Sequence, residues 1–358
     1  MSLIKENNNK ININIFNTFL IYIGSNLSLY LASCFIKKYK INKYKIVFTG
    51  QGGDRKSAYE DLEYILSKLD LNIKNFLVVE HDFNYNYFKM FKNSNSLREN
   101  FLNFQDKENV TFVTSYNYGL VNSLLKNIYD KKLDYYILED GIENWIDVKN
   151  KYYILKSFLY SIVIKKLIVI KKNRSTNTDI IISSLKNRRY YQTKNLIDIS
   201  DEFKNMVNLF SNSFKLKCKK ENNILIICAR TSWYVNGIDK FLINIRDNLF
   251  DQNKNLNNNN TDFYFKLHPG YTLENNKINF NIFKLIDNNS VPVEFFNLNK
   301  INYILSPINT SIVYIKELFN TDKKNIYYYN IKQKNYKKKL KLIKEFNIRK
   351  FKNKNYLY

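Results

Sequence analysis

The chain has 358 residues, 45% of them hydrophobic, which is enough for two domains of ordinary size with real hydrophobic cores. Its 57 Lys and Arg residues against 32 Asp and Glu give a formal net charge of +25, which favours nucleic acid, an acidic membrane surface or a negatively charged substrate as partner. Three scattered cysteines without CxxC spacing exclude a zinc knuckle and a disulfide framework, and they indicate a reducing compartment.

The start of the chain predicts a buried strand and no signal peptide. Its short apolar run follows an Asn-rich lead, lacks a small-residue cleavage site and is too short to span a bilayer. The run passes through Gly24, Ser25 and Asn26 into apolar residues at helical spacing. The chain is therefore expected to open with a strand, a turn and a helix.

Strand and helix patterns alternate along the rest of the chain. The expected strands lie at 43–48, 75–82, 110–119, 133–141, 222–229, 263–269, 302–307 and 325–330. The expected helices lie at 58–69, at 200–217 with Ser200 as cap, at 237–250 and from about 309. Such alternation predicts parallel sheets covered on both faces, in two α/β domains that face a central cleft.

The most apolar stretch, residues 152–172, is interrupted by Lys156, Lys165 and Lys166. A spanning helix would bury these charges at about 2.5–3.5 kcal/mol each, whereas a helix at the interface lets lysines reach the headgroups. We expect a buried or membrane-surface element there and no span.

The expected domains are residues 1–215, residues 216–330 and a basic tail at 331–358. The tail has many Lys and Arg residues against Glu345 alone, with apolar residues between them. That composition suits attachment to an anionic membrane, at about 1 kcal/mol per nearby cation, and equally a nucleic-acid arm or a solvated tail.

Chemistry-bearing residues follow three of the predicted strands, where ligands bind in open α/β sheets. They are Glu139-Asp140-Gly141, the run Lys266-Leu267-His268-Pro269-Gly270, and the pair Thr310-Ser311 at the start of a helix. A carboxylate can take a proton from an acceptor hydroxyl, and a histidine can give one to a leaving oxyanion at neutral pH. Hydroxyls at a helix N-terminus suit a phosphate.

Strand alternation limits how these side chains can act. Glu139 and Asp140 point to opposite faces, so only one of them can be the base in a given cleft. Lys266 and His268 share a face, and Pro269 biases the backbone of His268 towards an extended conformation.

The order of these motifs resembles that of bacterial sialyltransferases with the GT-B fold, which include lipooligosaccharide sialyltransferases and capsular polysialyltransferases. The family pattern is an acidic-acidic-Gly motif, then Lys-x-His-Pro-Gly, Pro-x-Glu and a hydroxyl pair before a helix. The matching stretches of this chain are EDG, KLHPG, PVE and a Thr-Ser pair. The family has Ser-Ser where this chain has Thr-Ser. The resemblance implies two Rossmann-like domains, the first on the acceptor side and the second binding a CMP-sugar.

The resemblance implies a catalytic role for Asp140 as base, with Glu139 as the other candidate, and for His268 as general acid or phosphate partner. Lys266 and Pro269 would belong to the donor site.

The remaining donor contacts that the resemblance implies are to CMP. Gly270 would approach the cytosine, Glu294 the ribose hydroxyls, and Thr310 and Ser311 the phosphate. Trp233 would lie on the acceptor side, as would Gly141 of the EDG motif.

The implied reaction is an inverting transfer of sialic acid from CMP-sialic acid to a hydroxyl of a cell-surface glycan, lipooligosaccharide or capsule. No metal or other cofactor is expected, because His268, Lys266 and a helix N-terminus supply positive charge and no Asp-x-Asp pair stands at a strand end. The expected location is the cytoplasm, peripheral on the inner face of the membrane.

Two alternatives stay open at the level of sequence. One is a GT-B transferase using another nucleotide sugar, such as CMP-Kdo, since the fold does not fix the donor. The other is a non-enzymatic basic protein that binds membrane or nucleic acid. The chain is rich in Asn, Lys, Ile and Tyr, a bias typical of an A/T-rich genome, so part of the basicity is compositional and no nucleic-acid partner is expected.

Overall fold

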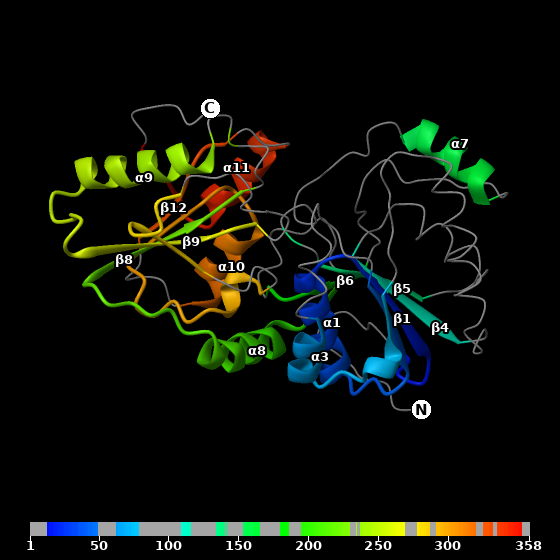
Figure 1. Ribbon diagram of the computed structural model, residues 1–358. Helices are drawn as coiled ribbons and strands as arrows, with labels where there is room; N and C mark the ends of the chain where they lie inside the picture. The colour runs from blue at the N-terminus through cyan, green and yellow to red at the C-terminus, as the bar shows by residue number, and fades with distance from the viewer. Residues whose placement is uncertain are drawn as a thin grey trace. The chain divides into compact units, whose positions relative to one another are not determined.

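The computed structural model divides the chain into two compact units, each built on a parallel sheet (Figure 1). The chain passes from the first unit to the second between Phe203 and Lys204, ahead of the expected boundary at 215. The structure describes residues 13–48, 62–78, 109–115, 134–139, 141, 153–164, 180–185, 195–229, 234, 237–268, 278–286, 291–319, 325–331 and 335–352.

The first unit holds a seven-stranded sheet in the order β3-β2-β1-β4-β5-β6-β7, with every pair parallel. Its strands are β1 Thr18–Ile23, β2 Tyr44–Phe48, β3 Phe76–Val78, β4 Val110–Thr114, β5 Asp134–Leu138, β6 Ile180–Ser183 and β7 Leu196–Asp198. Its helices are α1 Asn26–Lys38, α3 Leu62–Leu69, the 3-10 turn η1 Ile73–Asn75 and α7 Tyr153–Ile164, and α8 Ser200–Ser213 leads into the second unit.

The opening strand, turn and helix are confirmed. Ser25 caps α1, because its hydroxyl accepts a hydrogen bond from the backbone N–H of Ser28 at 3.1 Å. Phe19 of β1 packs edge-on against Phe35 of α1, with ring centroids 5.8 Å apart. One cap and one aromatic contact thus fix the helix on its strand.

Helix α8 begins where the sequence predicts, but its cap is a different residue. Ser200 is the first residue of the helix and its Oγ has no hydrogen-bond partner among the described residues, whereas the side chain of Asp198 accepts a hydrogen bond from the N–H of Ser200 at 2.9 Å. The expectation of Ser200 as cap is therefore wrong. Within the second unit, Phe210 of α8 packs on Phe295, and Phe214 directly after the helix packs on Phe296.

The second unit holds a six-stranded sheet in the order β10-β9-β8-β11-β12-β13, again parallel throughout. Its strands are β8 Asn222–Ile227, β9 Thr261–Lys266, β10 Phe283–Leu285, β11 Tyr303–Ser306, β12 Asn325–Tyr328 and β13 Arg349–Lys350. Its helices are α9 Ile238–Gln252, the 3-10 turn η4 Val293–Phe295, α10 Thr310–Leu318 and α11 Tyr336–Glu345.

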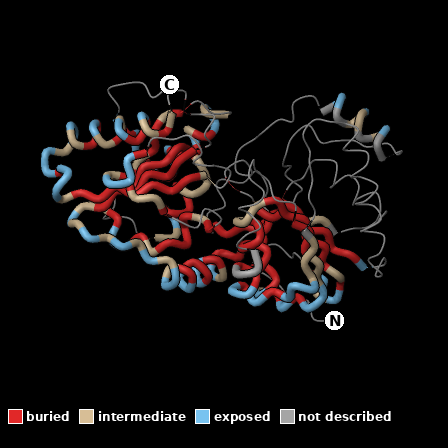
Figure 2. Tube along the Cα trace, in the orientation of Figure 1, coloured by how far each residue is buried: buried red, intermediate tan, exposed pale blue. Residues whose placement is uncertain are grey.

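Strand β9 is buried on both of its faces, as a central parallel strand should be (Figure 2). Phe263 and Phe265 belong to the hydrophobic cluster that includes Phe241 and Leu242 of α9. Tyr264 and Lys266 point to the other face by strand alternation. A lysine is therefore buried at the end of this strand.

The expected basic tail is instead part of the second unit over most of its length. Helix α11 buries Leu342 and Ile343, and β13 pairs with β12. Phe351 is 3% exposed and belongs to the main core cluster of the unit. The apolar residues between the lysines therefore pack in the interior of the second unit.

The α/β fold with two parallel sheets of GT-B type is confirmed. Counted within each unit, both sheets begin with the strand order 3-2-1-4-5-6, the arrangement of doubly wound nucleotide-binding folds. Among the helices that the structure describes, none is long and apolar enough to cross a membrane.

Candidate functional site

The candidate site lies at the carboxyl ends of β8, β9 and β11 in the second sheet. The strand order reverses between β8 and β11, because β9 and β10 lie on one side of β8 and β11 to β13 on the other. Open α/β sheets bind ligands at such a reversal, beyond the ends of the strands. Three of the predicted motifs follow or adjoin these strands.

Lys266 is the last residue of β9 and is 3% exposed. Burial lowers its pKa to about 8, although attraction to Glu294 opposes this shift. The thiol of Cys228 does not offset the charge, because burial raises its pKa to about 12 and keeps it neutral. A buried lysine with a shifted pKa at the ligand edge of a sheet is a candidate functional residue.

Glu294 of η4 is 1% exposed and lies in the same group. Burial raises its pKa, while its own backbone N–H, the hydroxyl of Ser311 and the charge of Lys266 act in the opposite direction. Its Oε2 has no hydrogen-bond partner among the residues that the structure describes. A buried carboxylate oxygen in this state costs free energy, and a ligand hydroxyl could supply the missing donor.

The N-terminus of α10 adjoins this carboxylate through Ser311. Asn309 caps the helix: its side-chain oxygen accepts hydrogen bonds from the N–H of Ile312 at 3.1 Å and from the hydroxyl of Ser306 at 3.0 Å. Thr310 and Ser311 form the first turn and are both partly exposed. The hydroxyl of Ser311 and a positive helix end therefore lie beside a buried acid that interacts with a buried lysine, and Thr310 precedes Ser311 in the same turn.

His268 follows β9 by two residues and is partly exposed. Leu267 between them is 2% exposed and belongs to the hydrophobic core, as the predicted alternation requires. Pro269 and Gly270 lie outside the described residues. The roles predicted for these three residues stay predictions.

A tyrosine pair at the end of β8 is a feature that the sequence reasoning missed. Tyr329 donates a hydrogen bond to the carbonyl of Ile227 at 2.6 Å and contacts the hydroxyl of Tyr234 at 3.1 Å. Tyr234 in turn accepts from the N–H of Ala229 at 2.5 Å. The pair fixes the chain on both sides of the segment that contains Trp233, which itself lies outside the described residues.

The acidic motif of the first unit is described in part. Glu139 is fully buried after β5, and its Oε2 accepts hydrogen bonds from the N–H of Ser184 at 2.8 Å and from its hydroxyl at 3.3 Å. Gly141 has φ of +115°, a conformation that L side chains rarely adopt, which explains glycine at that position. Asp140 lies outside the described residues. The contacts of Glu139 favour a structural role for it.

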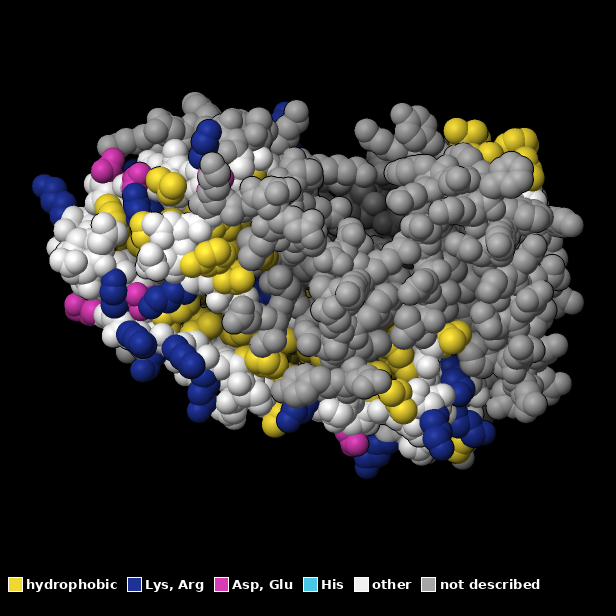
Figure 3. Space-filling view, in the orientation of Figure 1, with side chains coloured by type: hydrophobic (Ala, Val, Ile, Leu, Met, Phe, Trp, Pro, Cys, Tyr) yellow, Lys and Arg dark blue, Asp and Glu magenta, His cyan; other side chains and the backbone are white. Residues whose placement is uncertain are grey.

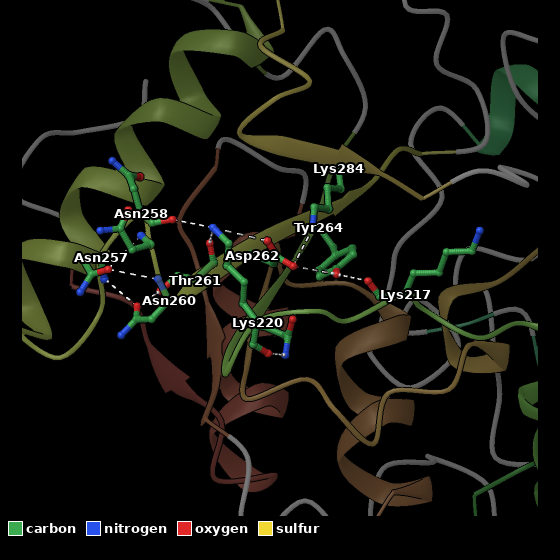
Figure 4. Close-up of polar contacts among 11 residues, drawn as sticks. Lys217, Lys220, Asn257, Asn258, Asn260, Thr261, Asp262, Tyr264 and Lys284 are labelled. Atoms are coloured by element: carbon green, nitrogen blue, oxygen red, sulfur yellow. Dashed lines mark hydrogen bonds and ion pairs between the residues drawn. The ribbon is translucent and has the colours of Figure 1, made fainter.

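Polar side chains also gather at the opposite end of β9, and they form a structural group (Figure 4). Asp262 pairs with Lys284 at 2.6 Å and with Lys220 at 3.7 Å, and Tyr264 donates to the carbonyl of Lys217 at 2.9 Å. Burial alone would raise the pKa of Asp262, but the two lysines outweigh it and lower that pKa. This carboxylate is fully partnered at the amino end of the strand, away from the expected ligand edge.

The predicted residues of the second unit are thus brought together in part. Lys266, Glu294 and Ser311 interact, and Thr310 adjoins them in α10. Among the described residues, no group of three or more His, Cys, Asp or Glu could hold a metal ion.

The comparisons with known proteins extend only to the fold. No protein-family model and no curated protein sequence matches the chain. The S. aureus MnaA–UDP structure is similar with a TM-score of 0.50 and 11% identity, over 88% of this chain and 80% of that one.

Two further structures are similar with lower scores. UDP-GlcNAc 2-epimerase from Methanocaldococcus jannaschii gives a TM-score of 0.48 at 15% identity, over 87% of this chain and 83% of that one. An α/β-galactoside α-2,3-sialyltransferase from Photobacterium phosphoreum gives 0.48 at 11% identity, over 93% and 98%.

Proposed function

We propose that the chain is an inverting sialyltransferase that moves sialic acid from CMP-sialic acid to a hydroxyl of a cell-surface glycan. The observation that carries the proposal is the buried carboxylate of Glu294, whose Oε2 has no described partner, beside Ser311, Lys266 and the N-terminus of α10. A nucleoside monophosphate offers hydroxyls for the carboxylate and an anion for the lysine and the helix end.

In this proposal the second unit binds CMP. Glu294 accepts a hydrogen bond from a ribose hydroxyl, which satisfies its open oxygen. Thr310 and Ser311 donate to the phosphate at the N-terminus of α10. Lys266 supplies positive charge to this site, and Pro269 and Gly270 are assigned to the donor site, with Gly270 near the cytosine.

The chemical step is a direct displacement at the anomeric carbon. Asp140 takes the proton of the acceptor hydroxyl, whose oxygen forms the new glycosidic bond on the face opposite CMP. The bond from the anomeric carbon to the phosphate oxygen breaks, and its electron pair leaves with CMP. His268 and the hydroxyl pair stabilise the charge that develops on that phosphate.

Glu139 supports the base in this scheme and does not replace it. Its Oε2 already receives two hydrogen bonds from Ser184, so it is poorly suited to take a proton from an acceptor. Gly141 and Trp233 are assigned to the acceptor side.

A thermal-shift titration with CMP, CDP, UDP and GDP tests the nucleotide. We expect CMP to raise the melting temperature more than the others, because ligands that bind only the folded state stabilise it. A larger rise in melting temperature with UDP would indicate a UDP-sugar as the donor. No rise with any nucleotide would overturn the proposal.

Incubation with CMP-sialic acid and lactose or an oligosialic acid primer then tests the transfer. We expect product in the presence of EDTA, and its loss in Asp140→Asn with CMP binding retained. Transfer from CMP-Kdo alone would identify the other donor, and a requirement for added metal would contradict the metal-free step.

A further inference from the structure

Helix α7 exposes four large apolar side chains to solvent. Ile154 is 69% exposed, Phe158 63%, Ile162 56% and Leu155 53%. At about 100° of rotation per residue these four positions fall within about 100° of the helix circumference. Figure 3 shows a group of yellow, hydrophobic side chains on the surface where Figure 1 labels α7.

This arrangement is the reverse of that in an ordinary surface helix. Such a helix turns an apolar stripe of this width towards the core and leaves its polar side chains in water. Helix α9 does so, with Ile238, Phe241, Leu242, Ile245 and Leu249 buried on one face. Among the residues that the structure describes, the exposed stripe of α7 therefore has none of the covering that stripes of this kind normally have.

The charge of the sequence around α7 indicates which kind of partner would bind its exposed stripe. Residues 148–178, which include α7, contain no Asp or Glu. Their cations are Lys149, Lys151, Lys156, Lys165, Lys166, Lys171, Lys172 and Arg174. A second copy of a chain with net charge +25 would bring like charges together at this surface, whereas an anionic bilayer would attract it.

The length of α7 fits a position in the plane of the membrane. Its 12 residues extend about 18 Å, well short of the roughly 30 Å of a bilayer's hydrocarbon core. Short helices with one apolar stripe and flanking lysines bind at the boundary between headgroups and acyl chains.

We propose that α7 is a membrane-surface helix that inserts Ile154, Leu155, Phe158 and Ile162 among the acyl chains of an anionic phospholipid bilayer. The inference concerns a surface of the first unit and does not depend on the nucleotide site. Of the two options that the sequence left open for residues 152–172, a buried or a membrane-surface element, it takes the second.

Co-sedimentation of the full chain with vesicles tests this helix. The vesicles are phosphatidylcholine alone or phosphatidylcholine and phosphatidylglycerol in equal parts. We expect binding to the anionic vesicles, weakened by added salt, and little binding to the neutral ones. The triple variant Ile154→Ser, Phe158→Ser, Ile162→Ser should bind anionic vesicles at least about tenfold more weakly, because three large apolar side chains no longer enter the bilayer.

The matched control is Leu209→Ser, Ile243→Ser, Phe280→Ser. It removes three apolar side chains of the second unit that are 61%, 41% and 53% exposed, and it should bind as the unchanged chain does. Thermal melting of both variants checks that each is folded.

Three outcomes would overturn the proposal. They are equal binding by the α7 variant and the control, no binding by the unchanged chain, and an α7-dependent dimer that does not bind vesicles. The last would identify a second copy of the chain as the partner of this surface.

Discussion

Two buried glutamates, one in each unit, show how differently a carboxylate can be placed. Oε2 of Glu139 accepts two hydrogen bonds from Ser184 after β6. Oε2 of Glu294 has no partner among the described residues, although the side chain is 1% exposed. The first carboxylate joins the ends of β5 and β6 through hydrogen bonds. The second has an oxygen that can still accept a hydrogen bond, and no described residue donates one.

For these two glutamates, the number of hydrogen-bond partners says more about the role of the carboxylate than its burial does. Burial alone would rank the two glutamates together, because both are almost fully excluded from water. A satisfied acid contributes to stability, whereas an unsatisfied one costs stability and is retained where a ligand completes it. Substitutions at the two positions should therefore have opposite effects.

The largest effect is expected for Glu294→Gln on nucleotide affinity. A hydrogen bond to a charged group contributes about 1.5–3 kcal/mol, so CMP should bind about 10-fold to 100-fold more weakly, as measured by isothermal titration calorimetry. The melting temperature without CMP is measured in parallel, because glutamine also removes the charge that attracts the buried Lys266 and can lower stability. Unchanged CMP affinity would contradict the role of Glu294, and Glu139→Gln is the matched control that should bind CMP normally.

The next effect is expected for Glu139→Ala on stability. The buried N–H of Ser184 would lose its acceptor, which should lower the free energy of unfolding by about 1–3 kcal/mol in urea denaturation. Glu139→Gln should lose less of the free energy of unfolding and keep transfer activity, since its amide oxygen can still accept the hydrogen bond from Ser184. Loss of turnover in a stable Glu139→Gln protein would instead make Glu139 the base.

The smallest effect is expected from pH. The pKa of Lys266 is lowered to about 8, so the lysine loses its charge above that pH instead of near 10.5. If the charged form favours the phosphate, CMP affinity should fall by up to about tenfold between about pH 7 and about pH 9, while the phosphate itself titrates near pH 6.

Lys266→Arg is the control for this pH dependence, because its guanidinium stays charged throughout this range. Its CMP affinity should be nearly constant with pH. An identical decline in both proteins would show that the lysine is not the titrating group.

Much of the fold was predictable because its strands are strongly apolar and its helices carry caps. The strands β1, β2, β8 and β9 and the helix α10 begin or end within a few residues of the predictions. The sequence reasoning missed β6, β7 and β10, which have only three or four residues, too few to show a period. It also missed α11, whose lysines obscured the apolar residues that it buries.

The site was predictable as a set of residues but not as a set of contacts. Alternation along β9 placed Lys266 correctly on the face opposite Phe265, because that rule is local. The hydrogen bond between Ser311 and Glu294 joins residues 17 positions apart and depends on how η4 meets α10. The tyrosine pair joins Tyr234 to Tyr329 across the sheet, and no local pattern signals it.

The last strand of the second sheet has a consequence for self-association. An edge strand exposes unpaired backbone groups on which another chain could extend the sheet, and this is a common route to aggregation. Strand β13 has only two residues, Arg349 and Lys350, and both are exposed. The guanidinium of Arg349 also lies over the ring of Tyr327, 5.4 Å from its centroid. A short, positively charged edge gives an incoming strand little to pair with and repels another copy of this basic chain.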